Sequence, residues 1–364
     1  MASKIIKGAW RMYQLGMEAR DYIFKNIDRL TENVLTCQAK IQPDLRERYG
    51  EQGYSYYCRD IKHHFRFLGN ALNYLSKGLF NSYIEWVKGL LSDLNIPTDD
   101  VINNFQCFKR VFENQAPENL RSLQFEFIDA GLTQFDEPTV EIPSFIDAAL
   151  PLSELATDYL NSLLQGDQTT ATQLIQKAIK RGIDIRDIYL QVLEKVQLEI
   201  GRLWQTNQLD VAEEHFSTSV TGLVMAQLYP HIKKSSQPKR TLVAACVSGE
   251  LHDLGIRIVS DFFELSGWKS YFVGANTPTP SILHAVVKQN ADLLGLSATI
   301  PLHVVEVEQV ISVVRKTDNI NDLKIVVGGR AFMIDQKLWR KIGADAYAPD
   351  ARSALDIVKE LFKK

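Results

Sequence analysis

The chain has 364 residues, of which 45% are hydrophobic and 23% are charged, and its formal net charge is −3. This length exceeds one ordinary domain, and the composition is that of a globular protein. Lys and Arg are scattered, so no basic face predicts a nucleic-acid partner. There is no signal segment and no run of 18 apolar residues, so we expect a cytoplasmic protein without a membrane partner. Four widely spaced cysteines predict reduced thiols and no zinc site.

Two polar stretches that contain proline divide the chain into three regions. They are DEPTVEIPSF at 136–145 and KKSSQPKR at 233–240, and both have the composition of linkers. We therefore expect three domains, at 1–140, 150–235 and 240–364.

The first region is rich in aromatic residues and in helical periodicity. Patterns typical of helices lie around 18–40, 56–76, 80–94 and 98–113. Gly78 and the sequence Asn95-Ile96-Pro97 interrupt them, and Thr98 with Asp99 begins the next helix. The region is predicted to be all-helical.

The second region predicts four helices with short connections, which is the pattern of a compact four-helix bundle. The apolar faces lie at 155–164, 174–179, 188–200 and 220–228.

The third region changes to short apolar runs separated by helical stretches. The runs lie at 241–247, 269–273, 293–297, 324–327 and, more weakly, 344–347. Strands that alternate with helices form βαβ units, so we expect a doubly wound parallel sheet of the Rossmann-like class.

A polar loop follows the first predicted strand, where ligands of doubly wound sheets bind. Its sequence is Glu250-Leu251-His252-Asp253-Leu254-Gly255. One ring nitrogen of His252 can bind a metal if the other donates to an acceptor, and Glu250 can be that acceptor. Gly255 would allow a close approach of the next helix to a ligand. Considered alone, however, a histidine after a strand is more often an exposed loop residue.

The spacing of small residues further along the chain reverses that interpretation. Gly255 and Ser297 are separated by 41 residues, and Thr299 and Gly328 by 28. The set resembles the DxHxxG, SxL and GG signature of the methionine-synthase-type cobalamin-binding fold, with Glu250 and Thr299 replacing the usual Asp and Leu. The resemblance implies that His252 is the lower axial ligand of the cobalt, and that small residues line a slot for the nucleotide tail. The implied cobalamin-binding set is Glu250, His252, Asp253, Gly255, Ser297, Thr299, Gly328 and Gly329.

A second motif lies upstream, in the bundle region. Trp204 is followed by nine residues and then by Glu214-His215. This resembles the Wx9EH signature of CarH-type light-responsive adenosylcobalamin proteins, in which a helical cap covers the corrin. The resemblance implies that Trp204 and Val211 pack against the adenosyl group, that Glu214 accepts from its hydroxyls, and that His215 lies on the same face. Gln205 stands where these repressors carry a second histidine.

The first region contains a third motif. Tyr57-Cys58-Arg59-Asp60 is followed by His63 and Arg66, and then by Ala71. This resembles the chromophore helix of phycobiliproteins, a globin-related family, and implies a bilin site for biliverdin. An Asp can accept from several pyrrole N–H groups, an Arg can pair with a propionate, and tyrosines can stack on the ring system. Cys58 adjoins Arg59 instead of preceding it by two residues, so non-covalent biliverdin is as consistent as a thioether link.

Two other interpretations of this region stay open. It is also consistent with a globin-like module that makes contacts without a ligand, or with a haem domain that uses His63 or His64 as its ligand. Adjacent histidines lie about 100° apart on a helix, so only one of the two can face a pocket.

The combination of a globin- or phycobilin-like domain, a helical cap and a Rossmann-like cobalamin domain resembles the photocobilin group of dual-chromophore photoreceptors. That resemblance implies a light sensor, not an enzyme, that binds adenosylcobalamin and biliverdin. Photolysis of the Co–C bond would change its assembly as a homo-oligomer, or its binding to a downstream protein. Two alternatives are a corrinoid methyl-transfer shuttle subunit and a cobalamin storage or delivery protein.

Overall fold

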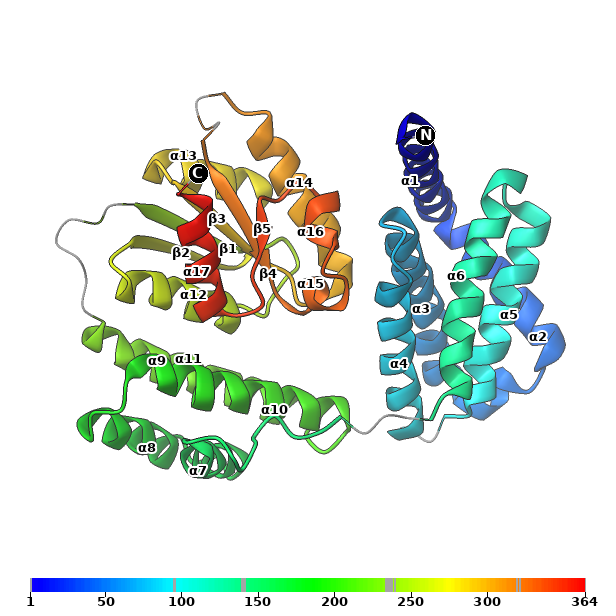
Figure 1. The fold of residues 1–364 in the computed structure, drawn as a ribbon. Coiled ribbons are helices and arrows are strands. Elements are labelled where there is room, and N and C mark those ends of the chain that lie inside the picture. The colour runs from blue at the N-terminus through cyan, green and yellow to red at the C-terminus, as the bar shows by residue number, and fades with distance from the viewer. Residues whose placement is uncertain are drawn as a thin grey trace. The chain divides into compact units, whose positions relative to one another are not determined.

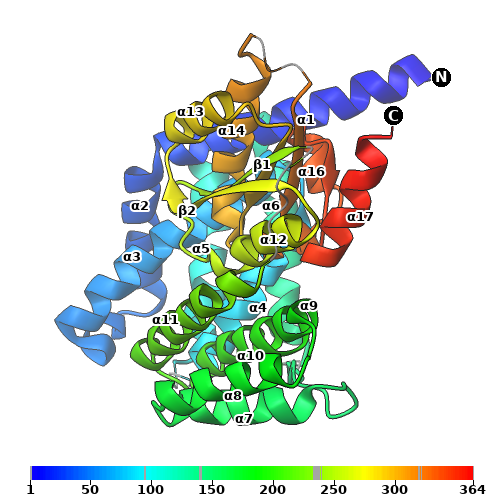
Figure 2. The same cartoon turned by 90° about the vertical axis from the view of Figure 1, so that its left-hand side faces the viewer.

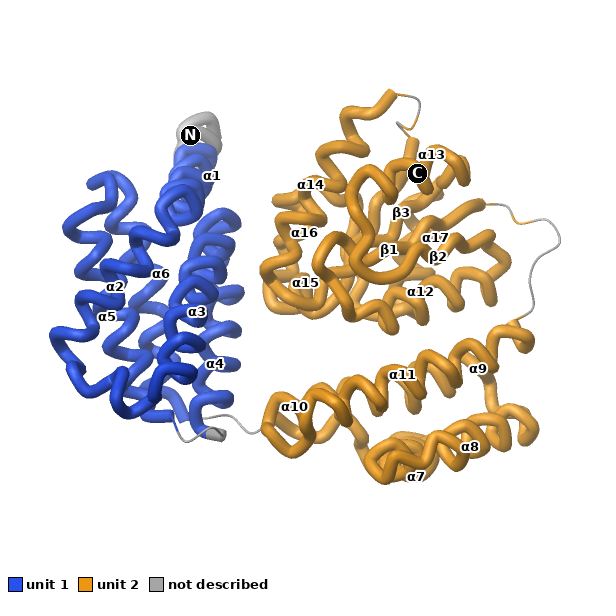
Figure 3. Tube along the Cα trace, turned by 180° about the vertical axis from the view of Figure 1, so that it is seen from behind, with its two compact units in different colours: residues 1–139 blue, residues 140–364 orange. Residues whose placement is uncertain are grey.

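The computed structural model describes residues 2–93, 96–138, 142–232, 238, 240–318, 320 and 322–363. The chain divides into two compact units, residues 1–139 and 140–364 (Figure 3). Asn95 and parts of both predicted linkers lie outside the described residues. No helix in the described ranges combines the length and the apolarity that a membrane crossing requires.

All regular elements among the described residues of the first unit are helices, as predicted (Figure 1). Its helices are α1 (Ala2–Lys25), α2 (Ile27–Ile41), α3 (Leu45–Asn73), α4 (Lys77–Asp93), α5 (Thr98–Gln115) and α6 (Glu118–Asp136).

The helix boundaries of this unit correct three predictions. The pattern at 18–40 is divided between α1 and α2 at Asn26, whose side-chain amide donates to the carbonyl of Tyr22 at 2.8 Å. This bond lets the chain bend without a glycine or proline. Gly78 lies inside α4 and does not separate helices, and α6 was not among the predicted helices.

The core of the first unit depends on aromatic stacking and on a close helix crossing. Phe65 of α3 stacks on Phe108 of α5, with ring centroids 3.9 Å apart. α1 crosses α3 at Gly16, where a Cβ atom would lie 2.3 Å from the carbonyl oxygen of Leu72. Any larger residue at Gly16 would therefore force the two helices apart.

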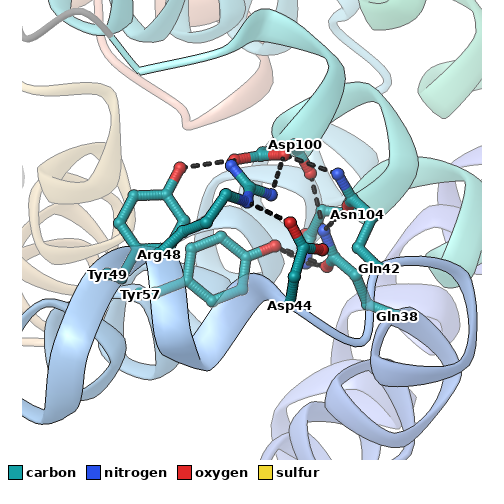
Figure 4. A network of polar contacts seen from close by, with 8 residues as sticks. All are labelled: Gln38, Gln42, Asp44, Arg48, Tyr49, Tyr57, Asp100 and Asn104. Atoms are coloured by element: carbon teal, nitrogen blue, oxygen red, sulfur yellow. Dashed lines mark hydrogen bonds and ion pairs between the residues drawn. The ribbon is translucent and has the colours of Figure 1, made fainter.

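A buried carboxylate fastens α5 to the helices before it (Figure 4). Asp100 is 1% exposed and pairs through both oxygens with the Arg48 guanidinium at 2.9 Å. Tyr49 and Gln42 also donate to it, each at 2.5 Å. Burial by itself raises the pKa of Asp100, but the Arg48, Tyr49 and Gln42 bonds lower it below the ordinary value. Asp100 is therefore a paired structural ion that joins α2, α3 and α5.

The second unit begins with a helical bundle. Its elements are α7 (Ser153–Leu164), α8 (Gln168–Lys180), α9 (Ile185–Asp187), the π-helical turn η1 (Ile188–Leu193), α10 (Glu194–Gln205), α11 (Val211–Leu228) and the short 3-10 turn η2 (Tyr229–His231). α9, η1 and α10 form one continuous helical stretch, so the bundle has the four-helix form that the sequence predicts. Asp210 and Glu213 form a capping box that fixes where α11 begins.

A five-stranded parallel sheet with the order β2-β1-β3-β4-β5 follows the bundle. The strands are β1 (Thr241–Val247), β2 (Lys269–Thr277), β3 (Leu293–Ser297), β4 (Lys324–Gly328) and β5 (Ala346–Tyr347). The helical elements between and after them are α12 (Leu254–Leu265), α13 (Thr279–Gln289), η3 (Pro301–His303), α14 (Val304–Arg315), α15 (Arg330–Ile334), α16 (Leu338–Lys341) and α17 (Ala351–Leu361). Each predicted strand overlaps an observed one, and the doubly wound parallel topology is confirmed.

The bundle packs against the sheet domain through α12 and α17. Figures 1 and 2 show α10 and α11 along the side of the domain that carries α12. Ile258 and Phe262 of α12 and Ala351 of α17 belong to the same hydrophobic core as the bundle helices. The bundle therefore shares a core with α12 and α17 of the sheet domain, and it lies next to the start of α12, where the loop of His252 ends.

Candidate functional site

The loop after β1 lies at the point where the strand order reverses, between β1 and β3. Connections leave the two strands toward opposite faces of the sheet there, which opens a crevice at their carboxyl ends. In this loop Glu250 is completely buried, whereas the side chain of His252 is 54% exposed. The chain thus presents the imidazole outward and the carboxylate inward.

One oxygen of Glu250 holds His252 in place. Oε1 accepts from the main-chain N–H of His252 at 3.0 Å and lies 2.5 Å from its Nδ1. Since an ionised carboxylate can only accept, Nδ1 carries the proton in the neutral ring and the lone pair is on Nε2. No hydrogen bond engages Nε2 among the described residues. The outward nitrogen is therefore the one with a free lone pair, as a metal-ligating histidine requires.

The other oxygen of Glu250 connects this loop to the loop after β3. Oε2 accepts from the main-chain N–H groups of Thr299 at 2.6 Å and Ile300 at 3.3 Å, and lies 3.0 Å from Nδ1 of His303. Sequence reasoning missed His303, which lies in η3 and is only 17% exposed in its side chain. Gly249 makes room for its ring, because a Cβ there would lie 3.1 Å from Nε2 of His303.

The end of β2 completes this arrangement. The side-chain oxygen Oδ1 of Asn276 accepts from the main-chain N–H of Gly249 at 2.8 Å. The main-chain N–H of Asn276 donates to the main-chain carbonyl of Glu250 at 2.8 Å. Asn276 adopts a φ of +47°, a left-handed conformation that Asn tolerates better than most residues. The end of β2 and the loops after β1 and β3 are thus joined around Glu250.

The protonation states of the pair favour this geometry. Burial alone raises the pKa of Glu250, but the hydrogen bonds from His252, His303 and the loop amides outweigh it and hold that pKa well below the ordinary range. The bond to Glu250 raises the pKa of His252, although burial opposes it. The carboxylate is therefore ionised at neutral pH and strengthens the electron donation of the ring.

The predicted slot lies between β3 and β4. Ser297 is 7% exposed and pairs in register with Gly328. Gly329 has a φ of +95°, and a Cβ there would lie 2.4 Å from the carbonyl oxygen of Ala298. The two glycines therefore serve the packing of the protein itself, in addition to any ligand. At Gly255, by contrast, a Cβ would meet no atom within 4 Å.

Asp253 is the residue of the predicted set that immediately precedes α12. It occupies the N-cap position but makes no side-chain cap bond. Burial raises the pKa of its carboxyl group, and Arg257 one turn further along lowers it. Its side chain therefore shares neither the Glu250 bonds nor a capping role.

The bundle brings its own predicted residues toward this loop. Glu214 lies close enough to His252 for its charge to raise the pKa of that ring. Gly222 lies beside Leu254, two residues after His252. Glu214 accepts from His215 at 2.5 Å and from Thr218 at 3.0 Å. Trp204, at the end of α10, and Val211, at the start of α11, are 43% and 55% exposed, which leaves two large apolar side chains uncovered.

The structure places the predicted bilin residues on α3. Tyr57 is engaged with Gln38 and with Asn104 of α5, so its hydroxyl is occupied within the unit. Arg59 lies over the Tyr56 ring at 5.1 Å. Burial raises the pKa of the Cys58 thiol and of the Asp60 carboxyl, while Arg59 and His63 lower that of Asp60. Arg59, Asp60 and Arg66 are exposed, and Cys58 and His63 are partly buried.

The two alternative haem ligands, His63 and His64, differ clearly in their exposure. The ring of His64 is buried, with its Nδ1 2.7 Å from the hydroxyl of Tyr83, and it packs against Phe105 at 5.0 Å. Burial lowers its pKa to about 3. His64 is a neutral core residue with an internal partner, so of the two only His63 is placed to meet a ligand.

Comparison with protein families supports the chemistry of the second unit. A model described as "B12 binding domain" matches residues 240–359, and a second model with the same description matches residues 155–229. These matches cover the sheet domain and the bundle, and neither extends into residues 1–139. The globin- or phycobilin-like nature of the first unit therefore stays a prediction.

Among solved structures, the monomethylamine corrinoid protein of Methanosarcina barkeri superposes with a TM-score of 0.50 at 19% identity, over 58% of this chain and 99% of that one. This likeness concerns the fold. Among curated proteins, a corrinoid protein of Desulfitobacterium hafniense is 23% identical over 218 residues, 58% of this chain and 100% of its own length. Dimethylamine corrinoid protein 2 of Methanosarcina acetivorans is 32% identical over 210 residues, which are 57% of this chain and 96% of that protein. On these grounds the chain belongs to the family of cobalamin-binding corrinoid proteins.

Proposed function

We propose that this protein is a corrinoid-carrying subunit that transports a methyl group, with a methyltransferase as its partner. The observation that carries the proposal is the buried Glu250, which fixes the tautomer of His252 and leaves Nε2 free at the sheet edge. The names of the curated relatives couple a corrinoid to methylated amines. This favours a methyl group as the cargo over the light-sensing function that the sequence motifs imply.

The residues of the second unit fit a corrinoid. His252 would bind the cobalt through Nε2, and Ser297, Thr299, Gly328 and Gly329 would line the slot for the nucleotide tail. A bound corrinoid supplies a cobalt centre that accepts and releases a methyl group. Glu250 keeps the Nδ1 proton of His252 in place and thereby sets the basicity of Nε2. The exposed bundle residues Trp204 and Val211 would cover the bound group and exclude water from it.

The axial role of His252 is tested by spectroscopy. The full chain is loaded with hydroxocobalamin, reduced to the Co(II) state and examined by electron paramagnetic resonance. We expect nitrogen coupling from one protein imidazole, lost in His252→Ala and kept in His284→Ala, which removes an exposed histidine of α13. Equal spectra for the two variants would exclude His252 as the ligand.

The cargo is tested by loading the chain with methylcobalamin in the dark and adding a thiol acceptor with a corrinoid-dependent methyltransferase. We expect demethylation of the bound cofactor at a rate well above that of free methylcobalamin. Binding without demethylation by any such enzyme would favour storage or delivery instead.

A light sensor that holds adenosylcobalamin is the second candidate, favoured by the exposed Trp204 and Val211 beside Glu214-His215 on the bundle. These side chains provide an apolar wall and hydrogen-bonding groups of the kind that a nucleoside requires. The chain also carries residues 1–139, which neither family match reaches. For this candidate, we infer that Asp60, His63 and Arg66, with Tyr57, Cys58 and Arg59, hold biliverdin in the first unit.

Illumination separates the two candidates. The chain is reconstituted with adenosylcobalamin and biliverdin in the dark, and spectra and sedimentation are recorded before and after green light. A change of sedimentation on illumination would support the sensor. Unchanged sedimentation, together with demethylation of methylcobalamin, would support the methyl carrier. A red-absorbing band that disappears in Asp60→Asn would locate the bilin.

A further inference from the structure

The seam between the bundle and the sheet domain contains two buried acids. Asp261 and Glu264 of α12 are 6% and 8% exposed. The hydroxyl of Tyr189, in the wide turn η1, donates to Oδ2 of Asp261 at 2.7 Å. Near the other end of the seam, the Tyr229 hydroxyl of η2 lies 3.4 Å from Glu264. Of the two contacts, the one between Tyr189 and Asp261 is short and buried at both partners.

Apolar side chains isolate this bond from water. Tyr189 is completely buried, and its ring centroid lies 6.3 Å from that of Phe262. Phe262 and Ile258 belong to the core of the bundle. A hydrogen bond in such surroundings is electrostatically stronger than one at the surface, and an acid left there without its donor is unfavourable. The bond joins the bundle to α12, so it breaks when the bundle leaves α12.

We propose that Tyr189 and Asp261 form a latch that holds the helical bundle on the sheet domain, and that its opening uncovers the start of α12 and the adjoining loop of His252. Tyr189 lies in a π-helical turn, a feature that occurs often at functional positions. Exposed pairs such as Asp187 with Arg352, at 3.4 Å, contribute little beside this contact. The latch rests on contacts inside the second unit and stands independently of the methyl-carrier proposal.

The latch is sensitive to pH. Burial raises the pKa of Asp261 to about 6, against the lowering effects of the Tyr189 bond and Arg257, and Glu264 raises it further. From the other packed elements, η2 contributes Tyr229, α9 contributes Arg186, which donates to the carbonyl of Leu265, and β2 contributes the uncharged Ser270. Because the closed state favours the neutral acid, closure is strongest below the ordinary carboxyl range and weakens as pH rises through about 6.

Hydrogen–deuterium exchange of the full chain tests the latch. Protection factors of the α12 amides, which are corrected for the intrinsic pH dependence of exchange, report how often the bundle opens. Wild-type protection should fall about tenfold between pH 5 and pH 8. Tyr189→Phe should lower it by a further factor of about ten at pH 6. The matched control is Tyr159→Phe, which deletes a buried hydroxyl bonded to Thr221 within the bundle.

Asp261→Asn keeps an acceptor for Tyr189 but cannot ionise. In this variant the protection factors of the α12 amides should stay high and should not depend on pH. A purely structural role of Asp261 would not remove the pH dependence. The latch is overturned if the α12 amides have equal protection factors in Tyr189→Phe and Tyr159→Phe. It is also overturned if α12 protection in Asp261→Asn depends on pH as it does in the wild type. Should Tyr189→Phe fail to fold, the pH profile of Asp261→Asn alone decides.

Discussion

At the scale of single residues, one carboxylate determines the chemistry of the site. One carboxylate oxygen of Glu250 contacts the ring of His252. The other accepts from two loop amides and contacts the ring of His303. A buried charge of this kind is stable only while its donors are present. The sequence predicted the pair Glu250 and His252, because the two residues are neighbours in the chain. It did not predict His303, because no local pattern shows that a ring 53 residues from Glu250 reaches the same carboxylate.

Because Glu250 is ionised in the folded chain, the free energy of unfolding should decrease at low pH. Its pKa in the folded chain is lowered, so its contribution is present above the ordinary carboxyl range and is lost as pH falls toward the folded value. We expect Glu250→Gln to lower the free energy of unfolding by roughly 2–3 kcal/mol at pH 7, with a smaller difference below pH 4. Urea denaturation at both pH values measures this.

The control for Glu250 is Asp356→Asn, which removes a carboxylate that is 70% exposed and pairs with Lys359 on the surface. Its effect on the free energy of unfolding should be small, because the pair is exposed to solvent. A Glu250→Gln variant as stable as this control would contradict the buried ion.

At the scale of elements, prediction succeeded where one signal dominates. Apolar runs locate the strands because strands of a parallel sheet are buried on both faces. β2 extends to Thr277, beyond the predicted 273, because Gly274, Ala275 and Asn276 carry no apolar signal. The break at Asn26 escaped prediction because a side-chain hydrogen bond produces it, without a glycine or proline.

The glycines near the site should differ in their tolerance of alanine. Gly329→Ala forces a Cβ to 2.4 Å from the Ala298 carbonyl at a left-handed φ, so we expect a loss of about 2–4 kcal/mol in the free energy of unfolding. Gly255→Ala meets no atom within 4 Å and should be neutral or slightly stabilising without a ligand. Equal losses for the two variants in urea denaturation would show that the Gly329 turn relaxes.

The capping box of α11 is a second test at this scale. Asp210 accepts from the N–H of Glu213 at 2.8 Å, and Glu213 accepts from the N–H of Asp210 at 2.8 Å. Asp210→Ala should lower the free energy of unfolding by about 1 kcal/mol and increase amide exchange in the first turn of α11. Glu213→Gln keeps an acceptor at that position and should change both little. Similar exchange in the two variants would contradict the box.

At the scale of the whole molecule, the two units have separate cores. Residues 1–139 bury aromatic side chains around Phe65 and Phe108, and residues 140–364 share a core between bundle and sheet. The sequence predicted that the chain is divided but not that bundle and sheet form one unit, because the contacts of Phe262 with the bundle are remote in sequence.

Separate cores predict separate unfolding. Calorimetry should resolve two transitions, and hydroxocobalamin should raise the midpoint of only the transition that belongs to residues 140–364. The assignment is made with the variant Gly16→Leu, which forces α1 from α3 and should lower only the other transition. A single transition that shifts as a whole in both experiments would show that the units unfold together.

The shared carboxylate also has an evolutionary consequence. The end of β2 and the loops that follow β1 and β3 meet at Glu250, so a mutation in one of these segments changes the bonds of the other two. A change of His303 to an apolar residue removes one hydrogen-bond donor of Glu250. A shorter acid at position 250 cannot contact the rings of His252 and His303 at the same time at these distances. Among descendants of this chain, positions 250, 276 and 303 are therefore expected to change in concert, while position 252 keeps its histidine.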